Sequence, residues 1–156
     1  MKKYLVIGNP IEHSLSPKLH NFWMKKNNIN AIYEKEKILD SDLKDLIAKV
    51  QKGEISGINV TVPFKKKVID YLDQLSIGSK ITQSVNTISL NGKNLIGYNT
   101  DIDGFELAIK NINFNVLNKK ILILGAGGVV SSIIFALKKL KAQQIIVSNR
   151  TRKKAE

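Results

Sequence analysis

The stretch that decides the fold is Ile121-Leu122-Ile123-Leu124-Gly125-Ala126-Gly127-Gly128-Val129-Val130. Its apolar half predicts a buried strand over Lys120–Leu124, and its glycines predict a sharp turn into a helix over residues 129–140. Glycine at such a turn lets the backbone approach a pyrophosphate closely, where the helix N-terminus can hold it. A second strand over Gln144–Ser148 completes a strand–turn–helix–strand unit, so we expect the opening of a dinucleotide-binding Rossmann domain.

The segment after the second strand, Asn149-Arg150-Thr151-Arg152-Lys153-Lys154, indicates which dinucleotide binds. A site specific for NAD usually places an acidic residue here, against the ribose 2′-hydroxyl. This segment has four cations and no acidic residue before Glu156, which favours the 2′-phosphate of NADP. The plainer interpretation is a helix-capping loop beside a solvated basic face.

Toward the N-terminus, strand and helix patterns alternate, which predicts an α/β fold. Ser16 is expected to cap a helix that begins with Pro17, and Asn91-Gly92 to form the type I′ turn of a hairpin. The turn-rich segment 113–118 predicts a boundary between a domain of residues 1–113 and one of residues 114–156. We expect strands over residues 4–7, 31–38, 57–62, 85–90 and 94–98, and helices from residue 16 and over residues 40–51, 64–72 and 101–112.

Composition excludes several classes of protein. The chain has 156 residues, 43% of them hydrophobic, and no cysteine, and it lacks the run of about 18 apolar residues that a membrane helix needs. Its first apolar run is too short for a signal peptide, so we expect a cytoplasmic protein. The net charge is +12, but 23 of the 25 basic residues are Lys, which is typical of an AT-rich genome. We therefore expect neither a nucleic-acid nor a membrane partner.

Two polar segments of the first domain stand out as candidate binding sites. Ser14 and Ser16 lie between a strand and a helix, where one hydroxyl can cap the helix and the other can bind a ligand oxygen. Asn59 and Thr61 share one face of a strand and suggest a polar pocket floor, over which Lys65 could reach. The plainer interpretations are a double cap and an edge strand with one solvated face.

A third segment pairs Asn86-Thr87 with Asn99-Thr100-Asp101. Asp101 either stabilises the start of the following helix or orients and charges a partner lysine. His13 and His20 lie seven residues apart without a Cys or acidic partner at metal-binding spacing, so we expect no metal site.

Six blocks, in order and at matching spacing, resemble the shikimate dehydrogenase family over essentially the whole chain. Any single block would be weak, but the six together are specific. They are Gly8-x-Pro10-x-x-His13-Ser14-x-Ser16-Pro17, Asn59-Val60-Thr61-Val62-Pro63-Phe64-Lys65, Val85-Asn86-Thr87, Gly97-x-Asn99-Thr100-Asp101-x-x-Gly104, the turn at residues 125–128 and Asn149-Arg150-Thr151.

The resemblance implies an enzyme that reversibly reduces 3-dehydroshikimate to shikimate with NADPH, in aromatic amino-acid biosynthesis. It implies that Lys65 and Asp101 are the catalytic pair. Lysine suits this reaction because an ammonium group stabilises the negative charge that hydride transfer builds on a ketone oxygen, and can donate the proton. Implied substrate contacts are Ser14, Ser16, Asn59, Thr61, Lys65, Asn86 and Asp101. Implied cofactor contacts are Gly125, Ala126, Gly127, Gly128, Val129, Asn149, Arg150, Thr151 and Lys154.

The chain is short for this assignment. A Rossmann domain has roughly six strands, and only two follow residue 118. We therefore expect the chain to be truncated in its cofactor domain and to have little or no dehydrogenase activity alone. Two alternatives stay open: a related oxidoreductase acting on quinate or an aminated analogue, and a non-catalytic module that binds shikimate. A monomer and a homodimer are both compatible with the sequence.

Overall fold

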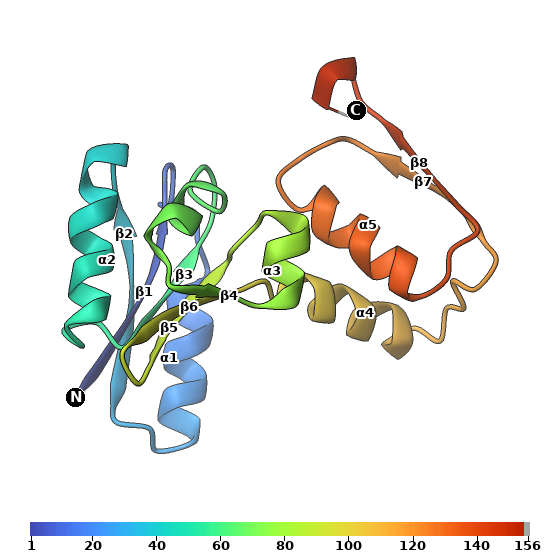
Figure 1. Cartoon of the computed structure of the whole chain (residues 1–156). Coiled ribbons are helices and arrows are strands. Elements are labelled where there is room, and N and C mark those ends of the chain that lie inside the picture. Colours follow the sequence, from blue (N-terminus) through green and yellow to red (C-terminus); the bar gives the residue numbers. More distant parts are fainter. Residues whose placement is uncertain (155–156) are drawn as a thin grey trace.

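The computed structural model describes residues 1–154, with Lys154 described by its backbone alone. The chain forms two lobes (Figure 1), and the larger contains a mixed sheet in the order β2-β1-β3-β5-β6-β4. Its strands are β1 Lys2–Gly8, β2 Ala31–Lys37, β3 Gly57–Val60, β4 Gln74–Leu75, β5 Thr87–Asn91 and β6 Asn94–Tyr98. The helices of the chain are α1 Ser16–Lys26, α2 Leu43–Gln51, α3 Ile77–Thr82, α4 Asp101–Asn111 and α5 Val130–Lys139, with 3₁₀ turns at Asp40–Asp42, Lys67–Tyr71 and Arg152–Lys154.

The sheet is covered on both faces because successive side chains of a strand point in opposite directions. Leu5 and Ile7 of β1 join the main core with the apolar face of α2. Val6, between them, packs on the other face with Tyr33 of β2 and Met24 of α1. The alternation of strands and helices, and hence the predicted α/β fold, is confirmed.

The hairpin lies where the sequence predicts it, but its turn type differs. Asn91 pairs with Asn94, so Gly92 and Lys93 are the two central residues of the turn. Only Gly92 has a positive φ, of 60°. A type I′ turn needs positive φ at both central positions, whereas glycine at the first is the mark of type II′. The predicted type I′ turn is therefore wrong.

Two other local predictions are also wrong. The expected helix over residues 64–72 is a short 3₁₀ turn at Lys67–Tyr71, preceded by a turn in which the Phe64 N–H donates to the Thr61 carbonyl. Burial of Phe64 and Val68 produces the apolar spacing that mimics a helix. The N-cap of α1 is Leu15, and Ser16 is the first residue of the helix. The Ser16 N–H donates to the Ser14 hydroxyl at 3.3 Å.

The smaller lobe contains parallel strands β7 Lys120–Leu124 and β8 Gln144–Ser148, joined through α5. Half-buried and exposed positions alternate along both strands, and Leu122 and Leu124 are 59% and 79% exposed. The prediction that Lys120–Leu124 is buried is therefore wrong within residues 1–154. The sheet has only two strands there, and one of its faces stays open. Helix α5 packs against α4 and α3, which joins the lobes. No helix in the described part of the chain is long and apolar enough to cross a membrane.

Candidate active site

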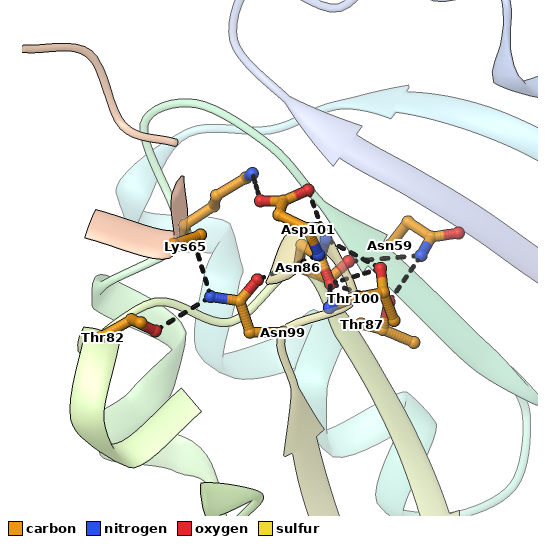
Figure 2. A network of polar contacts seen from close by, with 9 residues as sticks. Asn59, Lys65, Thr82, Asn86, Thr87, Asn99, Thr100 and Asp101 are labelled. Carbon is orange, nitrogen blue, oxygen red and sulfur yellow. Dashed lines mark hydrogen bonds and ion pairs between the residues drawn. The ribbon is translucent and has the colours of Figure 1, made fainter. Parts of the chain in front are cut away.

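Lys65 and Asp101 form an ion pair where the two lobes meet (Figure 2). Lys65 follows β3, and Asp101 is the first residue of α4, so the fold brings together side chains that are 36 residues apart. The Lys65 Nζ lies 2.7 Å from the Asp101 Oδ2, and the two side chains are 19% and 24% exposed. The ammonium group is thus shielded from bulk water yet accessible to a small ligand.

Asn86, just before β5, fixes the other carboxylate oxygen. Its Nδ2 donates to the Asp101 Oδ1 at 2.9 Å and to the Thr100 hydroxyl at 3.0 Å, while its Oδ1 accepts the Thr100 N–H at 3.0 Å. The Asn86 side chain is buried. Because both carboxylate oxygens are bonded, the Asp101 side chain cannot rotate freely, and its bond to Lys65 is kept in place.

Asn59 occupies the adjoining end of β3 and is held by three bonds. Its Nδ2 donates to the Thr87 hydroxyl at 2.9 Å and to the Asn86 carbonyl at 3.2 Å, and its Oδ1 accepts the Tyr33 hydroxyl at 2.6 Å. Figure 2 shows Asn59, Asn86 and Asp101 in one continuous polar network. An amide oriented in this way presents a fixed pattern of donor and acceptor to a hydroxylated ligand.

Tyr33 was not predicted as a site residue. It is almost fully buried, and burial raises the pKa of its hydroxyl to about 12, so this group stays a hydrogen-bond donor at neutral pH. The His20 ring stacks on the Tyr33 ring at 4.2 Å, and burial lowers the pKa of His20. The sequence signal is weak, because Tyr33 is simply the last uncharged residue of β2, before a run of four charged residues.

The remaining predicted substrate residues lie nearby but outside this network. Thr61 is one residue past β3, and its N–H donates to the Ile7 carbonyl at the end of β1. The loop that begins at that same end of β1 carries Ser14 and leads into α1, whose first residue is Ser16. Within residues 1–154, no hydrogen bond joins these three hydroxyls to Asn59, Asn86 or Asp101. Their substrate roles stay predictions.

A cavity of about 420 Å³ connects the ion pair to the glycine turn. The Ser84 hydroxyl in its wall is buried and has no hydrogen-bond partner among the described residues. Ser84 is therefore a buried polar group that the described side chains leave unsatisfied. The cavity is lined by Val62, Pro63, Lys65, Lys66, Thr82, Gln83, Ser84, Gly128 and Ser131.

The glycine turn is open toward the side where a phosphate would lie. Gly125 has a φ of 102°, which favours glycine, and its N–H donates to the Ser148 carbonyl at 2.7 Å. The Asn149 Oδ1 accepts the Ala126 N–H at 3.2 Å and so ties the turn to the end of β8. A Cβ built at Gly125, Gly127 or Gly128 meets no atom within 4 Å. The backbone is therefore accessible, as a pyrophosphate site requires.

The segment after β8 supplies the positive charge. Arg150, Arg152 and Lys153 are exposed, while the side chain of Lys154 lies outside the described residues. Val129 is the N-cap residue of α5, next to the turn. The described residues thus suit the diphosphate and the 2′-phosphate of NADP. Within residues 1–154, no group of three His, Asp or Glu side chains could hold a metal ion.

Two family models match the chain. One, described as the shikimate dehydrogenase substrate binding domain, covers residues 6–88, and one described as shikimate / quinate 5-dehydrogenase covers residues 106–156. Among curated proteins, a shikimate dehydrogenase (NADP(+)) of Pelagibacter ubique is 58% identical over 99% of this chain and 58% of its own. The chain therefore spans less than three fifths of the length of the curated relatives that it matches.

Solved structures resemble the whole described fold. A shikimate dehydrogenase from Aquifex aeolicus is 39% identical, with a TM-score of 0.92 over 99% of this chain and 58% of its own. A shikimate 5-dehydrogenase from Thermus thermophilus, solved in complex with NADP(H) and shikimate, is 32% identical, with a TM-score of 0.90 over 99% and 58%.

Proposed function

Because the chain belongs to the shikimate dehydrogenase family, we propose that it supplies the substrate site and catalytic pair of an NADP-dependent shikimate dehydrogenase. The observation that carries the proposal is the Lys65–Asp101 pair, held on its second carboxylate oxygen by Asn86. The product is shikimate, formed from 3-dehydroshikimate in a reversible reaction on the route to aromatic amino acids. We also propose the division into a substrate domain of residues 1–113 and a cofactor domain that starts at residue 114.

The polar network suits a ring that carries several hydroxyls. Asn59, Asn86 and Asp101 offer amide donors and carboxylate acceptors on one fixed surface, and Thr61 lies beside them. Ser14 in the loop after β1, and Ser16 at the start of α1, are proposed to hold the substrate carboxylate. Because these groups are neutral or anionic apart from Lys65, the ring hydroxyls rather than the carboxylate should face Asp101.

Lys65 is proposed to act on the ketone oxygen. When bound, NADPH supplies the hydride that reduces the ketone carbon. The Lys65 ammonium stabilises the negative charge on the oxygen and donates a proton from Nζ. Asp101 holds the ammonium by a bond of 2.7 Å, and its own orientation depends on Asn86. In the reverse direction the same amine accepts the proton of the alcohol.

The residues proposed to hold NADP are those of the glycine turn and the cationic end of β8. We assign Gly125, Ala126, Gly127, Gly128 and Val129 to the diphosphate. The Gly125 and Ala126 N–H groups already donate to Ser148 and Asn149, so these two residues would lie against the diphosphate with their open backbone rather than with a free donor. Asn149, Arg150, Thr151 and Lys154 would face the ribose 2′-phosphate. The cavity between Lys65 and Gly128 is the proposed meeting place of substrate and cofactor.

We propose further that the protein is cytoplasmic, a monomer or homodimer, without a nucleic-acid or membrane partner. Part of the charge supports this, because residues 119–156 hold nine basic residues and one acidic residue, and four of the nine follow β8, where the 2′-phosphate would lie. A mobility shift of DNA that weakens with salt would contradict the absence of a nucleic-acid partner.

An absorbance assay at the NADPH band tests the function. The proteins are the 156-residue chain and a chimera in which it is followed by the remainder of the Pelagibacter relative, each with shikimate or quinate and with NADP or NAD. We expect the chimera to oxidise shikimate with NADP and the 156-residue chain to show little or no turnover. Preference for quinate would favour a quinate dehydrogenase, which the description of the second matched family model also names. An inactive chimera that still binds shikimate would favour a non-catalytic binding module.

A further inference from the structure

Asn99 connects the catalytic carboxylate to the helix that follows the glycine turn. Its Oδ1 accepts the backbone N–H of Asp101 at 3.1 Å. Its Nδ2 donates to the Thr82 hydroxyl at 2.9 Å and to the Ser132 hydroxyl at 2.8 Å. Figure 2 shows Asn99 between Thr82 and Asp101. One side chain thus bonds to the start of α4, the end of α3 and the first turn of α5.

The burial of this link makes it a strong geometric constraint. Asn99 is 5% exposed and Ser132 is fully buried. Both Nδ2 protons of Asn99 are used, so a shift of α5 away from Asn99 would leave a donor without an acceptor in a region that excludes water. The link therefore tolerates little relative movement of the two lobes at this point.

The position of Ser132 carries the constraint to the cofactor turn. Ser132 is the third residue of α5, and the helix begins two residues after Gly128. A second link, the ion pair between Glu106 of α4 and Lys139 of α5 at 2.7 Å, holds the far end of the same helix. Because α5 is bonded through the buried Ser132 near its start and packs along α4, its N-terminus has a defined place relative to Asp101.

We propose that Asn99 is a positioning residue that keeps the Lys65–Asp101 pair at a fixed position relative to the glycine turn. The identity of the two sites rests on the proposed function, whereas the mechanical link between them does not. Asn99 touches neither reacting atoms nor cofactor in this scheme. It acts through the Asp101 backbone on one side and through Ser132 on the other.

Amide hydrogen exchange of the 156-residue chain tests the link without any activity. Ser132→Ala removes the acceptor on α5 and leaves Asp101 untouched. We expect the Asp101 amide to exchange about tenfold faster in this variant, since losing the anchor frees Asn99. The matched control is Ser79→Ala, which removes another fully buried hydroxyl that bonds to Ser76 rather than to Asn99. Equal Asp101 exchange in the two variants, after correction for their unfolding free energies, would overturn the proposal.

A second variant and a kinetic readout complete the test. Ser132→Cys keeps the side-chain size but weakens the acceptor, and should give the same direction of effect if the alanine variant fails to fold. In the chimera, Ser132→Ala should lower kcat about tenfold and leave the KM for shikimate within about twofold, because reacting groups are misplaced while substrate contacts persist. An unchanged kcat in an active chimera would refute the positioning role. A chimera with no activity would count against the proposed function, and the exchange result would still decide the link.

Discussion

Among single residues, Lys65 matters most to the proposed reaction, because its ammonium group supplies both the proton and the positive charge. Replacing Lys65 by Ala in the chimera should lower kcat by roughly two or more orders of magnitude and change the KM for shikimate much less, because proton donation and charge stabilisation occur in the transition state. The control is Lys67→Ala, which removes a neighbouring lysine that pairs with Asp40 outside the site. Near wild-type turnover of the Lys65 variant would exclude the assigned role.

His20 gives a prediction on pH. Burial places its pKa in the folded state below its usual value of 6.5, so the unfolded chain binds the proton more readily at acidic pH. The free energy of unfolding should therefore fall as pH drops through 6.5 toward the folded-state pKa. In His20→Phe, which can keep the stack on Tyr33, the fall between pH 7.5 and pH 5.5 should be smaller. Urea unfolding at the two pH values measures it, and an equal fall in both proteins would contradict the assignment.

The residues of the site differ in how far the sequence could predict them. The Lys65–Asp101 pair followed from the family resemblance, since a separation of 36 residues gives no local signal. Tyr33 could not be found in this way. Its bond to Asn59 depends on β1 lying between β2 and β3, which only the pairing of the strands reveals. The role of Asn99 likewise depends on the packing of α5.

At the scale of elements, the clearest prediction concerns the end of α3. Gln83 has a φ of 50°, in the left-handed region that favours glycine, and its side chain is exposed. Gln83→Gly should raise the free energy of unfolding by about 0.5 kcal/mol, because relief of backbone strain exceeds the added flexibility of the unfolded chain and the loss of the exposed hydrogen bond from Gln83 Nε2 to the Lys80 carbonyl. The reverse control is Gly53→Ala, at a φ of 76°, which should destabilise although nothing lies within 4 Å. Denaturant melts compare the two, and a destabilised Gln83→Gly would contradict the reasoning.

Element prediction succeeded where a local rule was decisive and failed where packing was. The β5–β6 hairpin and the glycine turn of α5 rest on backbone conformations that few residues other than glycine adopt. Residues 64–72 have a helical spacing of apolar side chains, yet they do not form an α-helix. Phe64 is buried in a tight turn, and Val68 is buried in the 3₁₀ segment that follows it. Spacing alone does not distinguish these two structures.

For the protein as a whole, β7 and β8 present an exposed apolar face, and within residues 1–154 their outer edges pair with no further strand. Leu122, Leu124 and Ile146 are all largely exposed. Such a surface favours self-association, so the 156-residue chain should form larger species as its concentration rises. Leu124→Lys should reduce this, whereas Leu107→Lys, which adds the same charge at an exposed site of α4, should not. Light scattering after size-exclusion chromatography makes the comparison, and equal association of both variants would contradict it.

The central claim is that the network around Asn59, Asn86 and Asp101 binds shikimate. Calorimetric titration of shikimate into the 156-residue chain tests it most directly, because it needs neither cofactor nor turnover. We predict binding in a 1:1 ratio, weakened at least about tenfold in Asn86→Ala, which removes the bond to the Asp101 carboxylate. Circular dichroism establishes that both proteins are folded. A folded chain that gives no binding heat, or an Asn86→Ala variant that binds shikimate as tightly as the wild type, would contradict the claim.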